Sequence, residues 1–203
     1  MRTNNIFLIA LTAALPTLSQ GQELRLSGGY NGSNVQPANG EGWTGRAGYQ
    51  FGADLLLGDQ MFLRTGLHLL VRNLDYSYAE ANGQGIPDAP PEDFDYTSRS
   101  LRVPLQVGLH VLDPEKGTAL NAYAVAGPSL LYTLNTRLSQ DELEVTTTDM
   151  QGYLGFGLGA TLGFLFIEGG YDVALSRAVE TNFTDPKVNM YYLMGGLRLQ
   201  LAR

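Results

Sequence analysis

The chain has 203 residues, no cysteine and a formal net charge of −7. The absence of cysteine excludes a disulfide framework and a thiolate metal site, and the acidic balance argues against a nucleic-acid partner. With 25 Gly, 11 Tyr and 16% charged residues, the composition is typical of a β-protein with little polar surface.

The N-terminal segment, residues 1–21, is predicted to be a secretory signal peptide. Arg2 gives it a basic start, and the apolar run Ile6–Leu15 is shorter than the roughly 20 residues that a membrane-spanning helix needs. Ser19 and Gly21 place small residues at the minus-three and minus-one positions of a cleavage site after Gly21. A membrane anchor or a buried helix is the alternative. We therefore expect one mature domain, residues 22–203.

Eight later segments alternate between apolar and polar or small residues, which is the periodicity of β-strands. They are Glu23–Asn31, Trp43–Leu57, Met61–Asn73, Leu101–Val111, Ala119–Thr133, Met150–Leu162, Leu165–Leu175 and Asn189–Leu201. The breaks between them are alternately long and short, as in a barrel threaded through a membrane. The sequence therefore predicts an all-β fold: an eight-stranded antiparallel up-and-down transmembrane β-barrel, with short periplasmic turns, long extracellular loops and both termini on the periplasmic side.

The two faces of these segments differ in chemistry, and this difference predicts which face meets lipid. One face is mostly aliphatic, whereas the other holds Gly beside Arg, Glu, Asp and His, as a narrow polar lumen needs. Arg46, for example, is expected to point inward. In Ala119–Thr133 both faces are apolar. There we expect the bulky residues outward and the alanines inward, namely Tyr123, Val125 and Leu131 against Ala122, Ala124 and Ala126. A soluble ligand-binding barrel, with its apolar face inward, is the alternative.

Two prolines conflict with the predicted strands, because a proline cannot donate a ladder hydrogen bond. A symmetric turn at Asp113–Gly117 would place Pro104 opposite Pro128. A paired bulge or a kink in the outer half of this hairpin would accommodate both residues.

Aromatic residues gather near the ends of the strands that lead into the long loops. This clustering predicts an interfacial girdle, with Tyr30, Trp43, Tyr132 and Tyr191 as its main members. Further candidates are Tyr76, Tyr78, Tyr96, Tyr153 and Tyr192. The opposite girdle would consist of Phe62, Phe164 and Phe166.

Inward-facing charges suggest a structural ionic network. A turn centred on Asp59 would place Asp54 opposite Arg64, and Gln50 opposite His68. A turn near Phe183 would place Glu168 opposite Arg198. Since an unpaired charge is costly in a low-dielectric interior, we hypothesise that these four charges form a buried plug. The alternative is that they are solvated lumen residues. A barrel of about eight strands is filled by its side chains, so open conduction is not expected.

Catalytic and metal-binding signals are weak. The two histidines, His68 and His110, both fall on the inner face, and no serine is evidently paired with either. We therefore predict no enzyme activity, no cofactor and no metal site, with an outer-membrane lipid-modifying enzyme as the alternative. The acidic stretch around Asp88, Glu92, Asp93 and Asp95 either binds divalent cations weakly or is a solvated loop.

Three short motifs resemble the Bacteroidetes outer-membrane β-barrel family that includes PorT, a component of a secretion system. They are Ser100-Leu101-Arg102-Val103-Pro104-Leu105, Ala122-Tyr123-Ala124-Val125-Ala126-Gly127-Pro128 and Gly169-Gly170-Tyr171. The resemblance implies an eight-stranded outer-membrane barrel, usually with no assigned activity.

Taken together, these patterns predict a small barrel of the bacterial outer membrane with a filled lumen and a structural or interaction role. Its expected partners are outer-membrane lipid and, through the extracellular loops, other envelope proteins of secretion or surface complexes.

Overall fold

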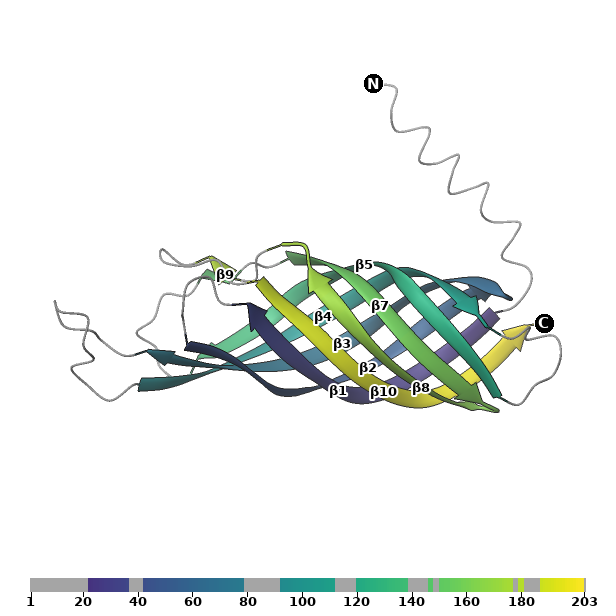
Figure 1. Ribbon diagram of the computed structural model, residues 1–203, viewed down its shortest axis with the longest axis horizontal. Coiled ribbons are helices and arrows are strands. Elements are labelled where there is room, and N and C mark those ends of the chain that lie inside the picture. Colours follow the sequence, from purple (N-terminus) through teal and green to yellow (C-terminus); the bar gives the residue numbers. More distant parts are fainter. Residues whose placement is uncertain are drawn as a thin grey trace, which may run out of the picture.

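Eight long antiparallel strands close into one barrel. The structure, a computed structural model, describes residues 22–36, 42–78, 92–111, 120–138, 146–147, 150–176, 179–180 and 187–202. The barrel strands are β1 (Gln22–Gln36), β2 (Gly42–Gly58), β3 (Met61–Tyr78), β4 (Glu92–His110), β5 (Leu120–Leu138), β7 (Met150–Leu162), β8 (Leu165–Ala174) and β10 (Lys187–Ala202). Each strand pairs with its neighbours in chain order, and β1 pairs with β10 to complete the circle (Figure 1). The predicted eight-stranded up-and-down topology is confirmed.

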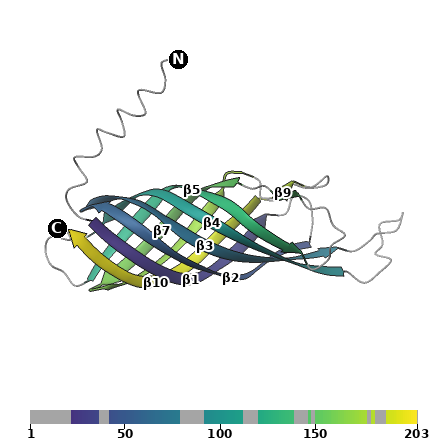
Figure 2. The same cartoon turned by 180° about the vertical axis from the view of Figure 1, so that it is seen from behind.

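Both ends of the barrel sequence lie at the end with short turns. Gln22 pairs with Leu57, next to the turn between β2 and β3, and also with Ala202 near the C-terminus. Two short strands, β6 (Thr146–Thr147) and β9 (Val179–Glu180), pair with each other at the opposite end (Figure 2). No helix long and apolar enough to cross a membrane occurs among the described residues.

Several strands extend further toward the long-loop end than the alternation predicts. β4 begins at Glu92 rather than Leu101, and β5 ends at Leu138 rather than Thr133. The alternation of apolar and polar residues ends with the aliphatic part of the outer wall. The backbone pairing between β3 and β4 continues beyond it, as far as the pair Tyr78 and Glu92. As a result, β2 to β5 project beyond the other strands as a four-stranded sheet, visible in blue to teal at the left of Figure 1.

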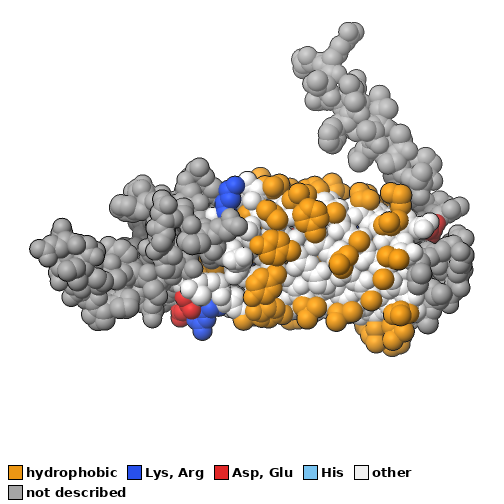
Figure 3. All heavy atoms as spheres, viewed as in Figure 1, with side chains coloured by type: hydrophobic (Ala, Val, Ile, Leu, Met, Phe, Trp, Pro, Cys, Tyr) orange, Lys and Arg blue, Asp and Glu red, His pale blue; other side chains and the backbone are white. Residues whose placement is uncertain are grey.

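The apolar face of the strands points outward, as predicted. Leu67, Leu105 and Ile167 are 52%, 53% and 55% exposed, whereas the inward residues Arg64 and Glu168 are 2% and 1% exposed. Figure 3 shows hydrophobic side chains spread over the barrel wall, with the visible charged side chains near its ends. This arrangement is the reverse of a soluble ligand-binding barrel, which buries its apolar face.

The predicted faces of β5 are wrong. Tyr123, Val125 and Leu131 are buried in the lumen at 1%, 3% and 0% exposure, whereas Ala122 and Ala126 are exposed on the outer wall. Because β5 is apolar on both faces, its periodicity holds no information about which face is inside. Its neighbours decide the question: Ala126 pairs with the outward Val107 of β4 and with the outward Phe156 of β7.

A β-bulge in β2 reverses the predicted direction of Arg46. The pairing with β3 shifts by one residue between Arg46 and Tyr49, so residues before the bulge change faces. The Arg46 side chain is consequently exposed on the outside of the projecting sheet instead of pointing into the lumen.

The two prolines do not face each other. Pro104 pairs with Ser129 of β5, and Pro128 pairs with Leu154 of β7. The ladder between β4 and β5 is interrupted just beyond Pro104, where Gly127 has a φ of 155° and a Cβ atom would lie 2.5 Å from the Leu105 oxygen. Glycine thus permits the local irregularity that the prolines require, without a paired bulge.

Candidate functional site

The centre of the lumen contains a buried ionic network contributed by three strands. Arg64 of β3 donates from Nη2 to Asp54 Oδ2 of β2 at 3.0 Å, and from Nη1 to Glu168 Oε1 of β8 at 2.6 Å. All three side chains are at most 2% exposed. The guanidinium therefore links opposite walls of the barrel.

Both carboxylates have further polar contacts. Glu168 accepts from the Tyr123 hydroxyl at 2.8 Å and from the Tyr192 hydroxyl at 2.9 Å. A ring nitrogen of His68, Nε2, lies 2.8 Å from Asp54 Oδ1. Buried ion pairs are tolerated when further hydrogen bonds satisfy the charged atoms. These contacts give every oxygen of the two carboxylates a partner, whereas Arg64 Nε has none among the described residues.

The pairing within the hairpins differs from the register expected from the sequence. Arg64 lies opposite Leu56 and Asp54 opposite Gly66, a shift of about two residues from the expected alignment. Arg64 still reaches Asp54 because both point inward and the arginine side chain is long. Gln50 lies opposite Leu70 rather than His68, because the same shift applies.

Arg198 is not part of this network. Glu168 lies opposite Met194, so Arg198 is placed nearer the short-turn end. There Arg198 Nη2 lies 2.7 Å from Glu23 Oε2, and Arg25 Nε lies 2.6 Å from Glu23 Oε1. The structure thus brings together three of the four predicted charges and places the fourth in a second cluster.

The second cluster also buries a guanidinium between aromatic rings. Arg25 lies 4.3 Å from the centroid of the Tyr123 ring and 5.1 Å from that of Phe166. Such stacking compensates part of the hydration that a buried cation loses. The prediction omitted Glu23 and Arg25, although their alternation with Leu24 and Leu26 in the sequence places both on the inner face.

A third ion pair links β4 to β8. Arg102 Nη2 lies 2.9 Å from Asp172 Oδ1, and the Arg102 guanidinium lies 5.3 Å from the Tyr192 ring centroid. Both charges were expected on the inner face, but β4 and β8 are not neighbours in the sheet. Strand-by-strand register therefore gives no sign of a contact across the lumen.

Two clusters of buried apolar side chains occupy parts of the remaining lumen. One buried cluster lies beyond the central network, toward the long-loop end, and comprises Leu70, Leu131, Tyr153, Ala174 and Met190. Another lies near the short turns and comprises Leu56, Phe62, Tyr123 and Val125. Side chains therefore occupy much of the interior, as expected for eight strands.

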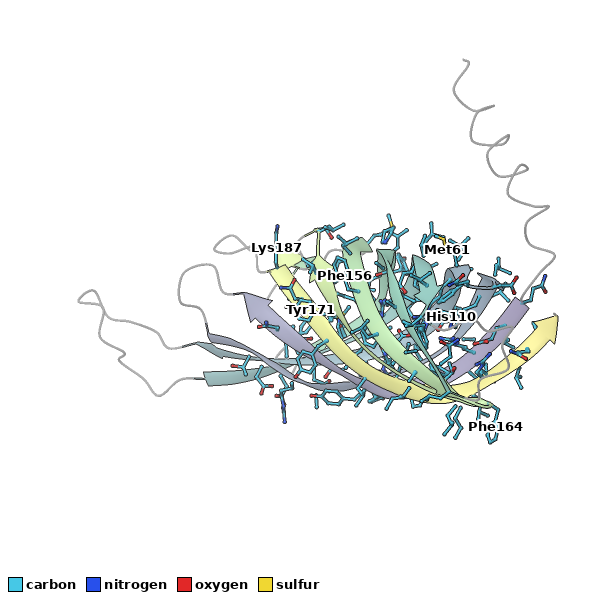
Figure 4. All side chains as sticks on the ribbon, turned by 45° about the vertical axis from the view of Figure 1, so that its right-hand side comes forward. Met61, His110, Phe156, Phe164, Tyr171 and Lys187 are labelled. Atoms are coloured by element: carbon cyan, nitrogen blue, oxygen red, sulfur yellow. The ribbon has the colours of Figure 1, made fainter. Side chains whose placement is uncertain are left out.

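Both histidines are buried inside the barrel. His68 contacts Asp54 as described, and His110 lies 4.8 Å from Phe62 between ring centroids. Figure 4 shows His110 inside the barrel and Phe164 projecting from the turn between β7 and β8. Neither imidazole can therefore reach a lipid on the outer wall. In the described part of the chain, no three His, Asp or Glu side chains are grouped to hold a metal ion.

Several of the predicted aromatic residues lie on the outer wall. Tyr30, Tyr132 and Tyr191 are 42%, 51% and 44% exposed, and the Tyr30 and Tyr191 rings lie 6.1 Å apart. Tyr49 is also exposed but was omitted from the predicted girdle. The side chain of Trp43 lies outside the described residues, as do those of Tyr76 and Tyr78.

For five other aromatic residues the predicted place in a girdle is wrong, because their side chains point into the lumen. They are Tyr96, Tyr153 and Tyr192 at the long-loop end, and Phe62 and Phe166 at the short-turn end. Phe164 is exposed. Closeness to a strand end does not determine the face on which a side chain lies. The alternation along the strands does, and it places most of these residues on the inner face.

The predicted signal peptide, residues 1–21, lies outside the described residues, as do Asp88 and the side chains of Glu92 and Asp93. Asp95 is described, and its Oδ1 atom lies 3.0 Å from Arg46 Nη1. Asp75 Oδ1 lies 3.2 Å from the same nitrogen. These residues line a cleft of about 330 Å³ on the projecting sheet, together with Asn73 and Thr97.

Comparison with solved structures finds the same fold in OprG, an outer membrane protein, and weaker similarity to two further proteins. OprG from Pseudomonas aeruginosa has a TM-score of 0.57 at 10% sequence identity, and the similarity covers 91% of this chain and 98% of OprG. Neisserial surface protein A has a TM-score of 0.49 at 13% identity, covering 89% and 97% of the two chains. The attachment invasion locus protein of Yersinia pestis has a TM-score of 0.42 at 13% identity, covering 89% and 99%.

No curated protein sequence matches the chain. Residues 18–185 match the family described as outer membrane protein beta-barrel domain. This match covers most of the chain, and the outward aliphatic face, the closed sheet and the structural relatives agree with it. The chain belongs to the outer membrane protein beta-barrel domain family, and the protein resides in the bacterial outer membrane.

Proposed function

We propose that this protein is a non-enzymatic outer-membrane barrel with a closed lumen, and that its extracellular end docks other envelope proteins. The observation that carries this proposal is the buried ionic network of Asp54, Arg64 and Glu168, which joins opposite walls of the lumen. A channel or a lumenal active site would need open space where these side chains meet. With the lumen closed at this point, we place the interaction surface at the extracellular end of the barrel.

The projecting sheet of β2 to β5 supports a docking role. Its outer face carries exposed polar and charged side chains, including Arg46, Asp75 and Asp95 around the 330 Å³ cleft. Tyr30, Tyr132 and Tyr191, which are exposed below this sheet, would mark the outer membrane interface. The sheet would then stand above the lipid, where a protein partner can reach it.

The resemblance to the PorT-containing family of Bacteroidetes suggests the class of partner. A barrel without its own chemistry would act as an accessory to a secretion or surface complex. Delivery to the outer membrane would require removal of residues 1–21. Mass spectrometry of the mature protein tests this point and should find Gln22 as the first residue.

Co-purification from native outer membrane tests the docking role. A tagged wild-type chain should retain specific envelope proteins, and Arg46→Glu should retain at least several-fold less of them. Gln60→Glu is the matched control, because Gln60 is exposed at the short-turn end of the barrel. Equal recovery with both variants, or no specific partner with the wild type, would reject docking through the projecting sheet.

Planar-bilayer recording tests the closed lumen separately. The purified barrel should give no large, stable conductance. A steady open channel would show that the ionic network does not close the lumen.

A further inference from the structure

The charged side chains inside the barrel are unequal in number. The described inward carboxylates are Glu23, Asp54, Glu168 and Asp172, and the inward guanidinium groups are those of Arg25, Arg64, Arg72, Arg102 and Arg198. Four of the five arginines lie within 3.0 Å of a carboxylate oxygen. Of these five arginines, only Arg72 has no carboxylate partner among the described residues.

Arg72 is buried among neutral groups. It is 3% exposed, and its Nη1 atom donates to the Tyr153 hydroxyl at 3.1 Å and lies 3.8 Å from Met190 Sδ. Its Nε atom lies 3.4 Å from Ser98 Oγ. Tyr153 in turn donates to Gln151 Oε1 at 2.8 Å, so its oxygen is free to accept from Arg72. A buried cation without a counter-charge costs several kcal/mol, so this arrangement calls for an anion.

Hydroxyl groups that lack partners lie on the same stretch of the inner wall. Arg72 pairs with Ser98 across β3 and β4, and Ser100, two residues further along β4, pairs with Thr133 of β5. Ser100 is 0% and Thr133 is 9% exposed, and neither hydroxyl has a hydrogen-bond partner in the described structure. These hydroxyls can donate to an oxyanion that already contacts the guanidinium.

We propose that the outer half of the lumen binds a small oxyanion (a carboxylate, sulfate or phosphate) between the Arg72 guanidinium and the hydroxyls of Ser100 and Thr133. The guanidinium supplies the charge and a planar pair of donors, which suits the two oxygens of such a group. The hydroxyls supply further donors from the adjacent strands. A metal cation would be repelled by Arg72, and water alone would leave the positive charge uncompensated.

NMR of the mature barrel in micelles tests this site directly. Sodium phosphate, sulfate and acetate are titrated separately at constant ionic strength, with sodium chloride as the balancing salt. The side-chain Nε–Hε resonance of Arg72, identified by its absence in Arg72→Gln, should shift saturably with at least one of the three anions. The other barrel resonances that respond should lose their shift in Arg72→Gln, or need roughly tenfold or more anion, as expected for loss of a charged hydrogen-bond donor.

Hydroxyl variants separate binding from general effects on the lumen. Ser100→Ala and Thr133→Val should each raise the anion dissociation constant by roughly three- to tenfold, the range for one neutral hydrogen bond. Thr161→Val is the matched control, because Thr161 is equally buried and unpartnered but belongs to the short-turn end of β7. It should leave the dissociation constant unchanged.

Three results would overturn the proposal. One is the absence of a saturable shift with all three anions, which would mean that a carboxylate of this chain already neutralises Arg72. Another is an equal response in Arg72→Gln and wild type. The third is an equal effect of Thr133→Val and Thr161→Val. If Arg72→Gln does not fold, the two hydroxyl variants and Arg72→Lys provide the same comparison, and none of these results bears on docking at the outer surface.

Discussion

The inner and outer halves of the lumen carry charge in different ways. Toward the short turns, every described inward carboxylate contacts a guanidinium, and two tyrosine hydroxyls also donate to Glu168. Toward the long loops, Arg72 contacts the hydroxyl groups of Ser98 and Tyr153 and the thioether of Met190. The apolar cluster that contains Leu70 and Ala174 lies at the boundary between these halves. On the inward face, Leu70 is the next residue after His68, and Ala174 is the next after Asp172.

From this difference we infer that the inner half stabilises the barrel, whereas the outer half is able to bind a ligand. In the inner half, removal of one charge deprives a buried partner of a counter-charge, so a single substitution is costly. In the outer half, Arg72 has only neutral neighbours among the described residues and is the proposed anion ligand. A substitution there should therefore change anion binding more than the free energy of unfolding. Stability measurements on matched variants test whether the two halves differ in this way.

Loss of Glu168 should have the largest effect. Glu168 accepts hydrogen bonds from Arg64, Tyr123 and Tyr192, and Glu168→Ala removes the acceptor for all three. We expect the free energy of unfolding to fall by about 3–5 kcal/mol, because Arg64 keeps only Asp54 as its counter-charge. Urea unfolding in micelles, followed by the fluorescence of the single tryptophan, measures this change.

Glu168→Gln is the control for this substitution. It preserves shape and one acceptor oxygen while it removes the charge, so its loss should be smaller than that of Glu168→Ala. A loss below about 1 kcal/mol for Glu168→Ala, the usual worth of one neutral hydrogen bond, would show that the network is solvated and does not stabilise the inner half.

Asp172→Asn should have an intermediate effect. Asp172 makes one described ion pair, with Arg102, which also stacks near the Tyr192 ring. Loss of one charged hydrogen bond is expected to cost about 1.5–3 kcal/mol, less than the loss at Glu168. The same urea titration compares the two variants. If Asp172→Asn proved the more damaging, the centre of the inner half would lie at Arg102 rather than at Arg64.

The sequence predicts the barrel well because lipid imposes a simple rule on every strand. A wall exposed to hydrocarbon must be apolar, so alternation identifies both the strands and the outward residues such as Leu67 and Leu105. The rule fails in β5, where the lumen also contains the apolar residues Val125 and Leu131. It fails again before Tyr49, because a one-residue bulge reverses the direction of Arg46.

The candidate site was less predictable because its contacts cross the lumen. The register predicted from a turn centred on Asp59 is wrong by two residues. It still identifies the Asp54–Arg64 contact, because the long arginine side chain spans that offset. In the last hairpin the register error is four residues, because Glu168 pairs with Met194 and not with Arg198, and these two charges are too far apart along the barrel to meet. Pairs such as Arg102–Asp172 depend on the curvature of the closed sheet, which no hairpin register contains.

Arg46→Ala should have the smallest effect on stability. Arg46 contacts Asp75 and Asp95, but its side chain is 56% exposed and both pairs lie on the outer face of the projecting sheet. Exposed ion pairs contribute about 0–1 kcal/mol, since water and salt screen them, and here removal of the cation also leaves two carboxylates opposite each other. The urea midpoint should therefore decrease slightly, and added salt should reduce the difference from wild type. A loss as large as that of Glu168→Ala would mean that the projecting sheet is part of the stabilising core and not a surface free to dock a partner.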